Sequence, residues 1–524
     1  MRPILERLGI YLPAAVALAL PTVFIPNAID SFILPRASIV IVGACVGTGV
    51  ALLLPGGPSL GPLRWPLLAA AAAALLAFVF SVSWPLSLAG AYTRYESVPM
   101  RLSYLGLLAV PVWLLRDERS RIWVVAAFVF GTAIACMEAL TQAGSGVSFR
   151  PDGNVGNANL LGALIAMAFP LAVSFGLRFD RFFVAWWFGA LAMVGGLVVT
   201  TSRSGALGAI AGCLALGVLA FRRRLWAAVS AAISAVVVSG GLWVIVFGPL
   251  RLLNNDPAQS RLQLWGDAFR MVAARPVTGW GEDATGLAFG RFVSADWAPG
   301  VTYDRTHSGV LETAATQGVL GLVAQAWVLV TLFQGIWRRR FSDSVGALGA
   351  ACVGYSVWVV FNFDWAPATG AFWLLAGTAW SAVRASDVAP APLMTDGAPR
   401  PGVARSVAAL VLALGAIGLG VMPILAEAWY AQGRPDLSVI ADPLQARYHW
   451  DYGISLETSG SVRAGVAELR RAADLGETEP QLYVDLGDAE LKLGDRASAR
   501  SAYKTALLID PYYAPAHQRL TALG

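Results

Sequence analysis

Residues 160–177 read LLGALIAMAFPLAVSFGL, an unbroken run without a charged residue that Arg178 ends. A transmembrane helix needs about 20 predominantly apolar residues to cross the hydrocarbon core of a bilayer. The run is therefore long enough to span a membrane. The whole chain agrees: of its 524 residues 57% are hydrophobic and 14% are charged, and the mean hydropathy is +0.62. Soluble domains carry about 25% charged residues, so the composition is that of a membrane protein.

Similar apolar stretches recur along the chain and predict an all-α, polytopic membrane protein with about 13 transmembrane helices. The basic N-terminus, residues 1–7, precedes the first stretch. We interpret it as the start of a retained helix rather than a signal peptide, because many further spans follow. The predicted spans centre near residues 17, 46, 73, 107, 130, 167, 191, 212, 237, 322, 354, 375 and 415.

The positions of the arginines indicate on which side of the membrane each connecting segment lies. Cytoplasmic loops are enriched in Lys and Arg, and every arginine cluster falls on one side of a thirteen-span alternation. This predicts a cytoplasmic N-terminus and a C-terminus outside the cytoplasm. The clusters are Arg2 and Arg7; Arg116, Arg119 and Arg121; Arg178 and Arg181; Arg222, Arg223 and Arg224; Arg338, Arg339 and Arg340; and Arg384, Arg400 and Arg405.

The net charge of +5 is almost entirely due to arginine, because Lys492 and Lys504 are the only lysines. We interpret this excess as a topology signal, and we expect no nucleic-acid partner because no motif for one accompanies it. The four cysteines stand alone in separate apolar runs, and no Cys/His cluster has the spacing of a metal site. The sequence therefore predicts neither a metal nor a cofactor.

Three polar segments fall on the outer side of this topology: residues 141–157, the turn at 200–204 and a long loop at about 249–307. Within the long loop, apolar residues recur at helical spacing between residues 259 and 274. This pattern predicts an amphipathic helix that lies on the membrane surface. Pro276 is expected to end it.

The composition changes after residue 426, where charged residues, Tyr and Gly appear in a helical pattern. Small residues there recur at a spacing of 34, the period of tetratricopeptide repeats, which stack helix pairs. We therefore predict a membrane domain, residues 1–426, with a cytoplasmic linker at 385–403, and a small repeat solenoid, residues 427–524. The solenoid is either a docking surface for a peptide, a protein partner or an acceptor, or a solvent-side cap for the helices. The period is marked by Gly453 and Gly487, by Gly460 and Gly494, and by Ala472 and Ala506.

Histidine is scarce in this chain. His449 and His517 fall in the repeat region, where a surface or packing role is favoured. His307 lies at the predicted outer mouth of the tenth span. Ser308 follows it, and after nine further residues comes Gly318-Val-Leu-Gly321. We interpret the two glycines as positions that allow close helix packing.

This arrangement resembles the His-[Asn/Ser/Gln]-x9-Gly-x-x-Gly signature of O-antigen ligases. Other segments resemble elements of the wider O-antigen ligase and polymerase superfamily, and together the resemblance covers roughly residues 90–335. The terminal repeats are not part of the familiar ligase pattern, which leaves the acceptor open. The matching segments are GNANLLG at 156–162, TSRSGA at 201–206, and SRLQLW at 260–265, followed by Pro276 and Gly279-Trp-Gly281.

The resemblance implies a GT-C-like glycosyltransferase fold, and a glycan on undecaprenyl pyrophosphate as the donor. The acceptor hydroxyl would attack the anomeric carbon with inversion as pyrophosphate leaves, without a metal. A base whose pKa is near neutral can take the proton of such a weak nucleophile, and His307 is the candidate. Asp304 and Glu312 are nearby in sequence, and either could orient its imidazole or serve as an alternative base.

The departing pyrophosphate needs positive charge, and the planar guanidinium fork suits phosphate oxygens. Arg203 and Arg261 stand in matching elements of the family on the predicted outer side, so we expect them to bind pyrophosphate. Asn157 and Asn159 could bond glycan or phosphate, or cap the start of the sixth span. Further candidates for binding the substrate are Arg94 and Arg101.

These residues predict an O-antigen ligase type of enzyme in the bacterial inner membrane, with its active site and repeats on the periplasmic side. A lipid A–core ligase is the first reading, a Wzy-type polysaccharide polymerase the second and a protein O-oligosaccharyltransferase the third. The acceptor would accordingly be lipid A–core, a growing polysaccharide or a protein. A flippase or transporter of lipid-linked glycans is the alternative from another class. Its spans would carry charges, whereas the polar motifs here gather on one face.

Overall fold

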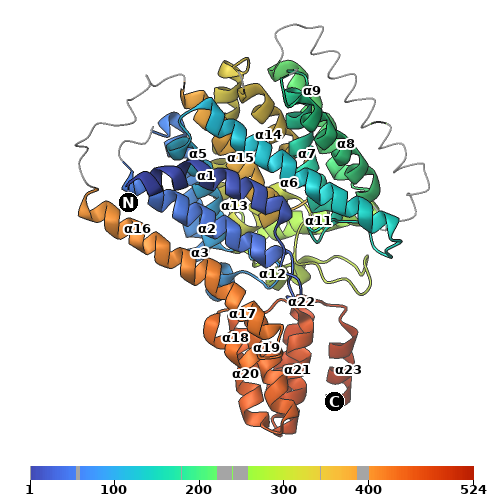
Figure 1. Ribbon diagram of the computed structural model, residues 1–524. Coiled ribbons are helices and arrows are strands. Elements are labelled where there is room, and N and C mark those ends of the chain that lie inside the picture. The colour runs from blue at the N-terminus through green and yellow to red at the C-terminus, as the bar shows by residue number, and fades with distance from the viewer. Residues whose placement is uncertain are drawn as a thin grey trace.

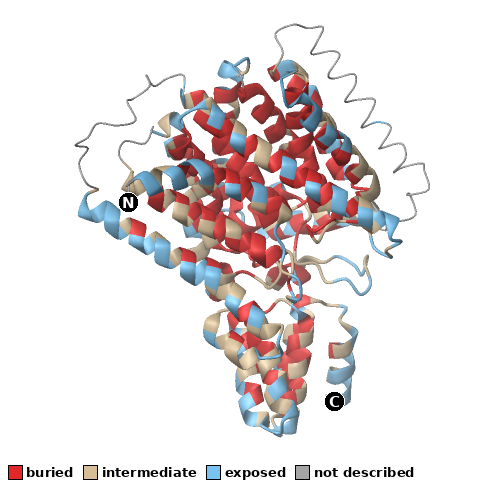
Figure 2. Cartoon of the chain, in the orientation of Figure 1, coloured by how far each residue is buried: buried red, intermediate tan, exposed pale blue. Residues whose placement is uncertain are grey.

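The chain folds into helices, and no strand occurs in the part that the structure, a computed structural model, describes (Figure 1). This confirms the predicted all-α fold class. Figure 2 shows that buried residues fill the interior of the helical bundle, while exposed residues gather on its outer surface. The structure describes residues 2–54, 59–178, 180–220, 239, 258–342, 344–385 and 401–524.

The predicted spans correspond to helices. Every predicted centre within the described residues lies inside a helix, and the centre near residue 237 lies outside them. Eight described segments are long and apolar enough to cross a membrane, and α5, α9 and α14 are apolar but shorter. The chain is therefore a polytopic helical membrane protein. The helices at these centres are α1 (Arg2–Thr22), α2 (Ile33–Leu53), α3 (Arg64–Val79), α5 (Val98–Leu114), α6 (Glu118–Gly144), α7 (Ala158–Gly176), α8 (Phe183–Thr200), α9 (Arg203–Leu219), α13 (Gly309–Arg339), α14 (Val345–Val360), α15 (Ala366–Ala385) and α16 (Val403–Gly415).

Helix α7 is the core of the bundle, and it contains most of the apolar run at 160–177. Every residue of α7 except Asn159 is buried, as expected for a helix that is apolar on all sides. It packs against α8, α9 and α14. A Cβ on Gly205 would lie 2.6 Å from the Cα of Gly162, so this approach needs glycine. The contact brings the N-termini of α7 and α9 together.

Helix α13 is interrupted at Gly318, where φ is +66° and ψ is −163°. The loop at 276–281 crosses this break. It donates two backbone N–H groups to α13 at 2.9 and 3.0 Å, and it accepts two from α13 at 2.7 and 3.4 Å. Gly318 therefore allows the close approach of a loop, whereas the sequence predicted close packing of a helix. The four donor–acceptor pairs are Trp280 to Ala315, Gly281 to Thr316, Val319 to Pro276 and Leu320 to Val277.

The predicted amphipathic helix is α11 (Ala258–Ala274), and it ends before Pro276. Leu264, Ala268 and Met271 form its buried face, while Leu262 and Phe269 are exposed. Its placement on a membrane surface stays a prediction. The rest of the long loop contains α12 (Thr285–Ala288) and η3 (Phe289–Phe292), and residues 249–257 lie outside the described part.

The predicted linker at 385–403 follows α15, which ends at Ala385. Its residues 386–400 lie outside the described part. Beyond it, α16, η4 (Ala416–Val421) and α17 (Met422–Tyr430) form one continuous helical segment. The domain boundary predicted between residues 426 and 427 therefore lies inside α17.

The C-terminal residues form a stack of helices below the bundle in Figure 1. Helices α19, α21 and α23 begin at residues 446, 480 and 514, and α20 and α22 begin at 462 and 496. Each series advances by 34 residues, which agrees with the spacing in the sequence, although assignment to the tetratricopeptide class stays a prediction. The stack consists of α18 (Pro435–Ala441), α19 (Ala446–Thr458), α20 (Val462–Leu475), α21 (Pro480–Lys492), α22 (Arg496–Ile509) and α23 (Ala514–Leu523).

A buried carboxylate joins the stack to the bundle. Glu427 of α17 accepts hydrogen bonds from the hydroxyls of Tyr92 and Tyr448, each at 3.0 Å, and from the backbone N–H of Asp30 at 2.7 Å. Asp30 and Tyr92 belong to the bundle, whereas Tyr448 belongs to α19. The C-terminal stack is thus held against the membrane domain by polar contacts as well as by the chain.

Candidate functional site

His307 lies in the last turn of the loop before α13 begins at Gly309. Its φ is +52°, a left-handed conformation that residues other than glycine seldom adopt. Its half-buried ring packs edge-on against Tyr303 and Phe363, at centroid distances of 5.9 and 5.1 Å. Uncommon backbone conformations persist where the surroundings enforce them, and they cluster at functional sites. The loop therefore holds the imidazole in a defined place.

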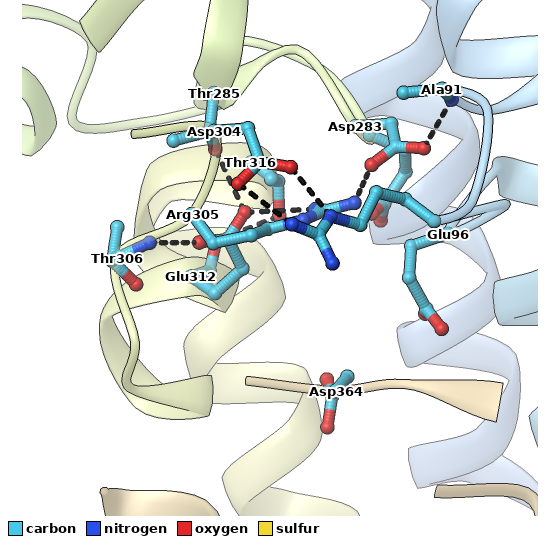
Figure 3. Close-up of polar contacts among 12 residues, drawn as sticks. Ala91, Glu96, Asp283, Thr285, Asp304, Arg305, Thr306, Glu312, Thr316 and Asp364 are labelled. Atoms are coloured by element: carbon cyan, nitrogen blue, oxygen red, sulfur yellow. Dashed lines mark hydrogen bonds and ion pairs between the residues drawn. The ribbon is translucent and has the colours of Figure 1, made fainter. Parts of the chain in front are cut away.

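Glu312, in the first turn of α13, holds the residues just before His307 (Figure 3). One carboxylate oxygen accepts the backbone N–H of Thr306 at 2.8 Å. The other accepts from the hydroxyl of Thr285 at 2.8 Å and from Arg305 at 3.1 Å. Arg305 also pairs with Asp283. Glu312 was predicted to orient the imidazole or to act as a base; its observed hydrogen bonds position the backbone of the loop.

Asp304 is paired with Arg94 at the edge of the same loop. The guanidinium bonds both carboxylate oxygens, with Nε–Oδ2 at 2.5 Å and Nη2–Oδ1 at 3.2 Å. It also lies over the rings of Phe363 and Trp365, at 5.4 and 4.8 Å. Because Phe363 also touches His307, the structure gathers three predicted site residues around one aromatic side chain. Both members of the ion pair are partly exposed, so a substrate can reach them.

Arg101 has a different environment from Arg94. Its guanidinium is buried, and it bonds Glu282 at 3.1 Å and Asp364 at 2.5 Å. Two carboxylates balance more than its single charge, so an added pyrophosphate would meet a net negative site. Arg101 ties α5 to the loop at 282 and to the turn before α15, which favours a structural role. Substrate binding by Arg101 stays a prediction.

Several acidic residues of this network escaped the sequence analysis. Glu96, Glu282, Asp283 and Asp364 are all buried. Burial raises the pKa of Glu96 to about 7, against the opposing effect of Arg101, and burial also raises the pKa of Glu282. Their position at the ends of apolar runs could have indicated that they form ion pairs, since a charge near hydrocarbon needs a partner. Their pairing, however, depends on distant parts of the chain.

The N-termini of α7 and α9 form a second group of predicted residues. Asn157 caps α7: its side-chain oxygen accepts the N–H groups of Asn159 and Leu160 at 2.8 and 3.3 Å. Asn159 accepts hydrogen bonds from Ser202 at 3.2 Å and from Arg150 at 3.1 Å. For Asn157 the structure thus shows the capping role left open by the sequence, and Asn159 links two helix ends.

Arg203 is the first residue of α9, and its side chain is exposed. Within the described residues it forms no hydrogen bond or ion pair. The ends of α7 and α9 both present backbone N–H groups and the positive end of the helix dipole. An exposed guanidinium beside them adds a full positive charge. This group, which we call the helix-end cluster (Asn157, Asn159, Ser202 and Arg203), therefore suits a phosphate.

The turn at 361–365, between α14 and α15, connects the two groups. Arg261 of α11 donates to the carbonyl of Phe361 at 2.7 Å, and Trp358 near the end of α14 donates to the carbonyl of Asn159 at 3.0 Å. His307 and Arg94 contact the turn through Phe363. This turn lies outside the motif segments, so sequence analysis did not identify it. It brings residues of five helices or loops to one end of the bundle.

The fold and these residues define a helical membrane protein with a histidine and several arginines gathered at one end of its helices. Residues 188–326 match the family model of the O-antigen ligases. The match supports the O-antigen ligase superfamily for this chain, and with it a ligase or polymerase type of function in general. The matched segment includes Arg203, Arg261 and His307. No curated protein matches the chain.

Proposed function

We propose that this protein transfers a glycan from undecaprenyl pyrophosphate to an acceptor hydroxyl at the periplasmic face of the bacterial inner membrane. The observation that supports it most is the setting of His307. The imidazole is held by a strained loop, against Phe363, next to the Arg94–Asp304 pair. The family match supplies the general class of reaction.

In this proposal His307 acts as the general base. The acceptor hydroxyl transfers its proton to the imidazole while its oxygen forms a bond to the anomeric carbon. The bond from that carbon to pyrophosphate breaks, and its electrons leave with undecaprenyl pyrophosphate. Attack opposite the leaving group inverts the anomeric carbon. A positioned base of this kind typically contributes about 10²–10⁴-fold to the rate.

The helix-end cluster and Arg261 receive the charge of the leaving group. Arg203 offers an exposed guanidinium, and the ends of α7 and α9 add backbone N–H groups. Positive groups that are already in place stabilise a developing anion without reorganising during the reaction. Arg94 contributes less charge, because Asp304 neutralises it, and we assign it to placing the acceptor near His307.

A lipid A–core ligase is the leading identity, because the complete histidine motif is associated with ligases. A polysaccharide polymerase is the second candidate. It is favoured by the position of the C-terminal stack, which lies against α12 in the long loop that leads to His307. A Cβ on Gly286 of α12 would lie 3.0 Å from the side chain of Thr478, which precedes α21. A growing chain offers an extended acceptor that such a surface could guide.

The test uses purified protein with the lipid-linked donor and separate candidate acceptors, with transfer measured as labelled product. His307→Ala should insert and bind donor normally but lose transfer by about 10²–10⁴-fold. His307→Gln keeps size and hydrogen bonding, and it should be equally impaired. His517→Gln, in the C-terminal stack, is the matched control and should transfer normally. A His307→Gln protein near wild type would refute the assignment of His307 as base.

A further inference from the structure

The C-terminal stack contributes one wall of a cavity beside the His307 loop. Gly290 of η3 lies so close to the backbone of Ile509 that a Cβ would collide with it. Next to this contact, the hydroxyl of Thr302 donates to the carboxylate of Asp510 at 3.1 Å. These contacts leave a cavity of about 360 Å³ between residues 289–303 and residues 509–515. Its volume falls in the range of small-molecule sites.

The cavity has an aromatic lining. Trp297 and Tyr303 pack together with ring centroids 4.8 Å apart, and Tyr512 is 45% exposed on the opposite wall. Aromatic side chains present a flat apolar face and, in Tyr and Trp, a polar edge. A sugar ring has the matching surface, with an apolar face of C–H groups and a rim of hydroxyls.

The charged groups of the cavity are carboxylates, which accept hydrogen bonds. Asp296 forms no hydrogen bond or ion pair within the described residues, and Asp510 accepts the hydroxyl of Thr302 and the backbone N–H of Tyr512. Ionised carboxylates accept but do not donate, so they suit sugar hydroxyls. None of the residues that line the cavity is Lys or Arg. An anionic ligand would therefore be repelled, whereas an uncharged sugar would be accepted.

Tyr303 lies between the cavity and the candidate active site, because it lines the cavity and packs against His307 with ring centroids 5.9 Å apart. We propose that this cavity binds uncharged sugar units of a glycan acceptor, so that the acceptor end reaches His307. This inference rests on the proposed function and names its acceptor class. It also gives the C-terminal stack a role, since residues 509–515 form one wall of the site.

The first test measures binding alone, so it does not depend on catalysis. The probe is a set of short, uncharged oligosaccharides released by mild acid from the surface polysaccharide of the host, added to the full-length protein in detergent. Saturation-transfer NMR should detect contact with wild type. Trp297→Ala and Tyr512→Ala should each weaken binding on the order of tenfold, the scale of one lost aromatic contact. Trp337→Ala, an exposed Trp at the opposite end of α13, is the control and should bind normally.

Trp297→Ala could weaken the fold, because Trp297 also donates to Asp267 at 3.0 Å. Tyr512 is exposed, so Tyr512→Ala tests the cavity without that effect on folding. In the transfer assay, both variants should raise the KM for the acceptor more than they lower kcat, with the donor KM unchanged. Absent binding to wild type, or normal binding by both variants, would overturn the cavity assignment even if transfer occurs. Binding of a Ser/Thr-rich peptide in place of the oligosaccharides would overturn it as well. Oligosaccharide binding without any transfer would instead count against the proposed function and leave the cavity assigned.

Discussion

Arg101 and Arg203 begin from similar sequence positions, near the ends of apolar spans, but the structure gives them opposite surroundings. Arg101 is buried between Glu282 and Asp364, whereas Arg203 is exposed at the start of α9 beside a second helix end. A buried cation that is already neutralised serves stability, and an exposed cation next to helix dipoles is available to an anion. The counterions of an arginine, rather than its motif, thus indicate its role.

The sharpest test of this contrast is Arg101→Ala, which should destabilise the protein by about 3–5 kcal/mol, because it leaves two buried carboxylates uncompensated. Thermal unfolding in detergent should show a large fall in Tm and a poor yield of folded protein. Arg203→Ala should unfold at the wild-type temperature. If Arg101→Ala is stable but binds the donor weakly, Arg101 belongs with the phosphate ligands.

The second test concerns the protonation of the buried network. The pKa of Glu96 is raised to about 7 in the folded state by burial, above the about 4.3 of an unfolded chain. The folded state therefore holds the proton more tightly, so this contribution to stability is present at low pH and is lost as pH rises through about 7. Tm should fall between about pH 5 and pH 8, and Glu96→Gln should reduce that fall. The hydroxyl of Tyr104 donates to Glu96, and a Gln oxygen can accept the same bond. An unchanged slope would show that Glu96 does not titrate in this range.

The third test addresses the helix-end cluster. Arg203→Lys keeps the charge but loses the guanidinium fork, so transfer should fall by roughly ten- to a hundredfold, the equivalent of a charge-assisted hydrogen bond. Stability should not change. The same substitution at Arg261 should also impair transfer, whereas Arg500→Lys in α22, which touches neither group, is the control. An Arg203→Lys protein with normal donor affinity and rate would reduce Arg203 to a surface charge.

The smallest expected effect is that of Asn157→Ala. Losing the cap of α7 should cost about 1 kcal/mol of stability. Asn157→Asp keeps the capping oxygen and should restore stability. If Asn157 acts only as a cap, the Asp variant should also recover transfer, because the helix end is restored. Transfer that stays low in a stable Asp variant would indicate direct contact with the anionic donor.

The sequence predicted the helical membrane fold well, because each span is a local property of about 20 residues. Gly162 and Gly205, where α7 and α9 approach closely, lie in the motif segments, but the sequence did not predict their contact. The buried network could not be predicted, because Glu96, Glu282 and Asp364 are separated by long stretches of chain. Each of them, taken alone, resembles an ordinary charged residue at the end of an apolar run. The ion pairs of Arg101 were not predicted for the same reason, because its partners are remote in the sequence.

The break in α13 has a consequence for the depth of His307. From Gly318 to Arg339 the helix has 22 residues, which is about 33 Å at 1.5 Å per residue. That length is close to the about 30 Å of a hydrocarbon core, so we expect the first nine residues of α13 to extend into the headgroup layer. Backbone hydrogen bonds from the loop at 276–281 satisfy peptide groups at the break, which lipid could not do. We therefore predict that the length of the second part of α13 places the imidazole at the level of the lipid phosphates, where the proposed donor would present its own.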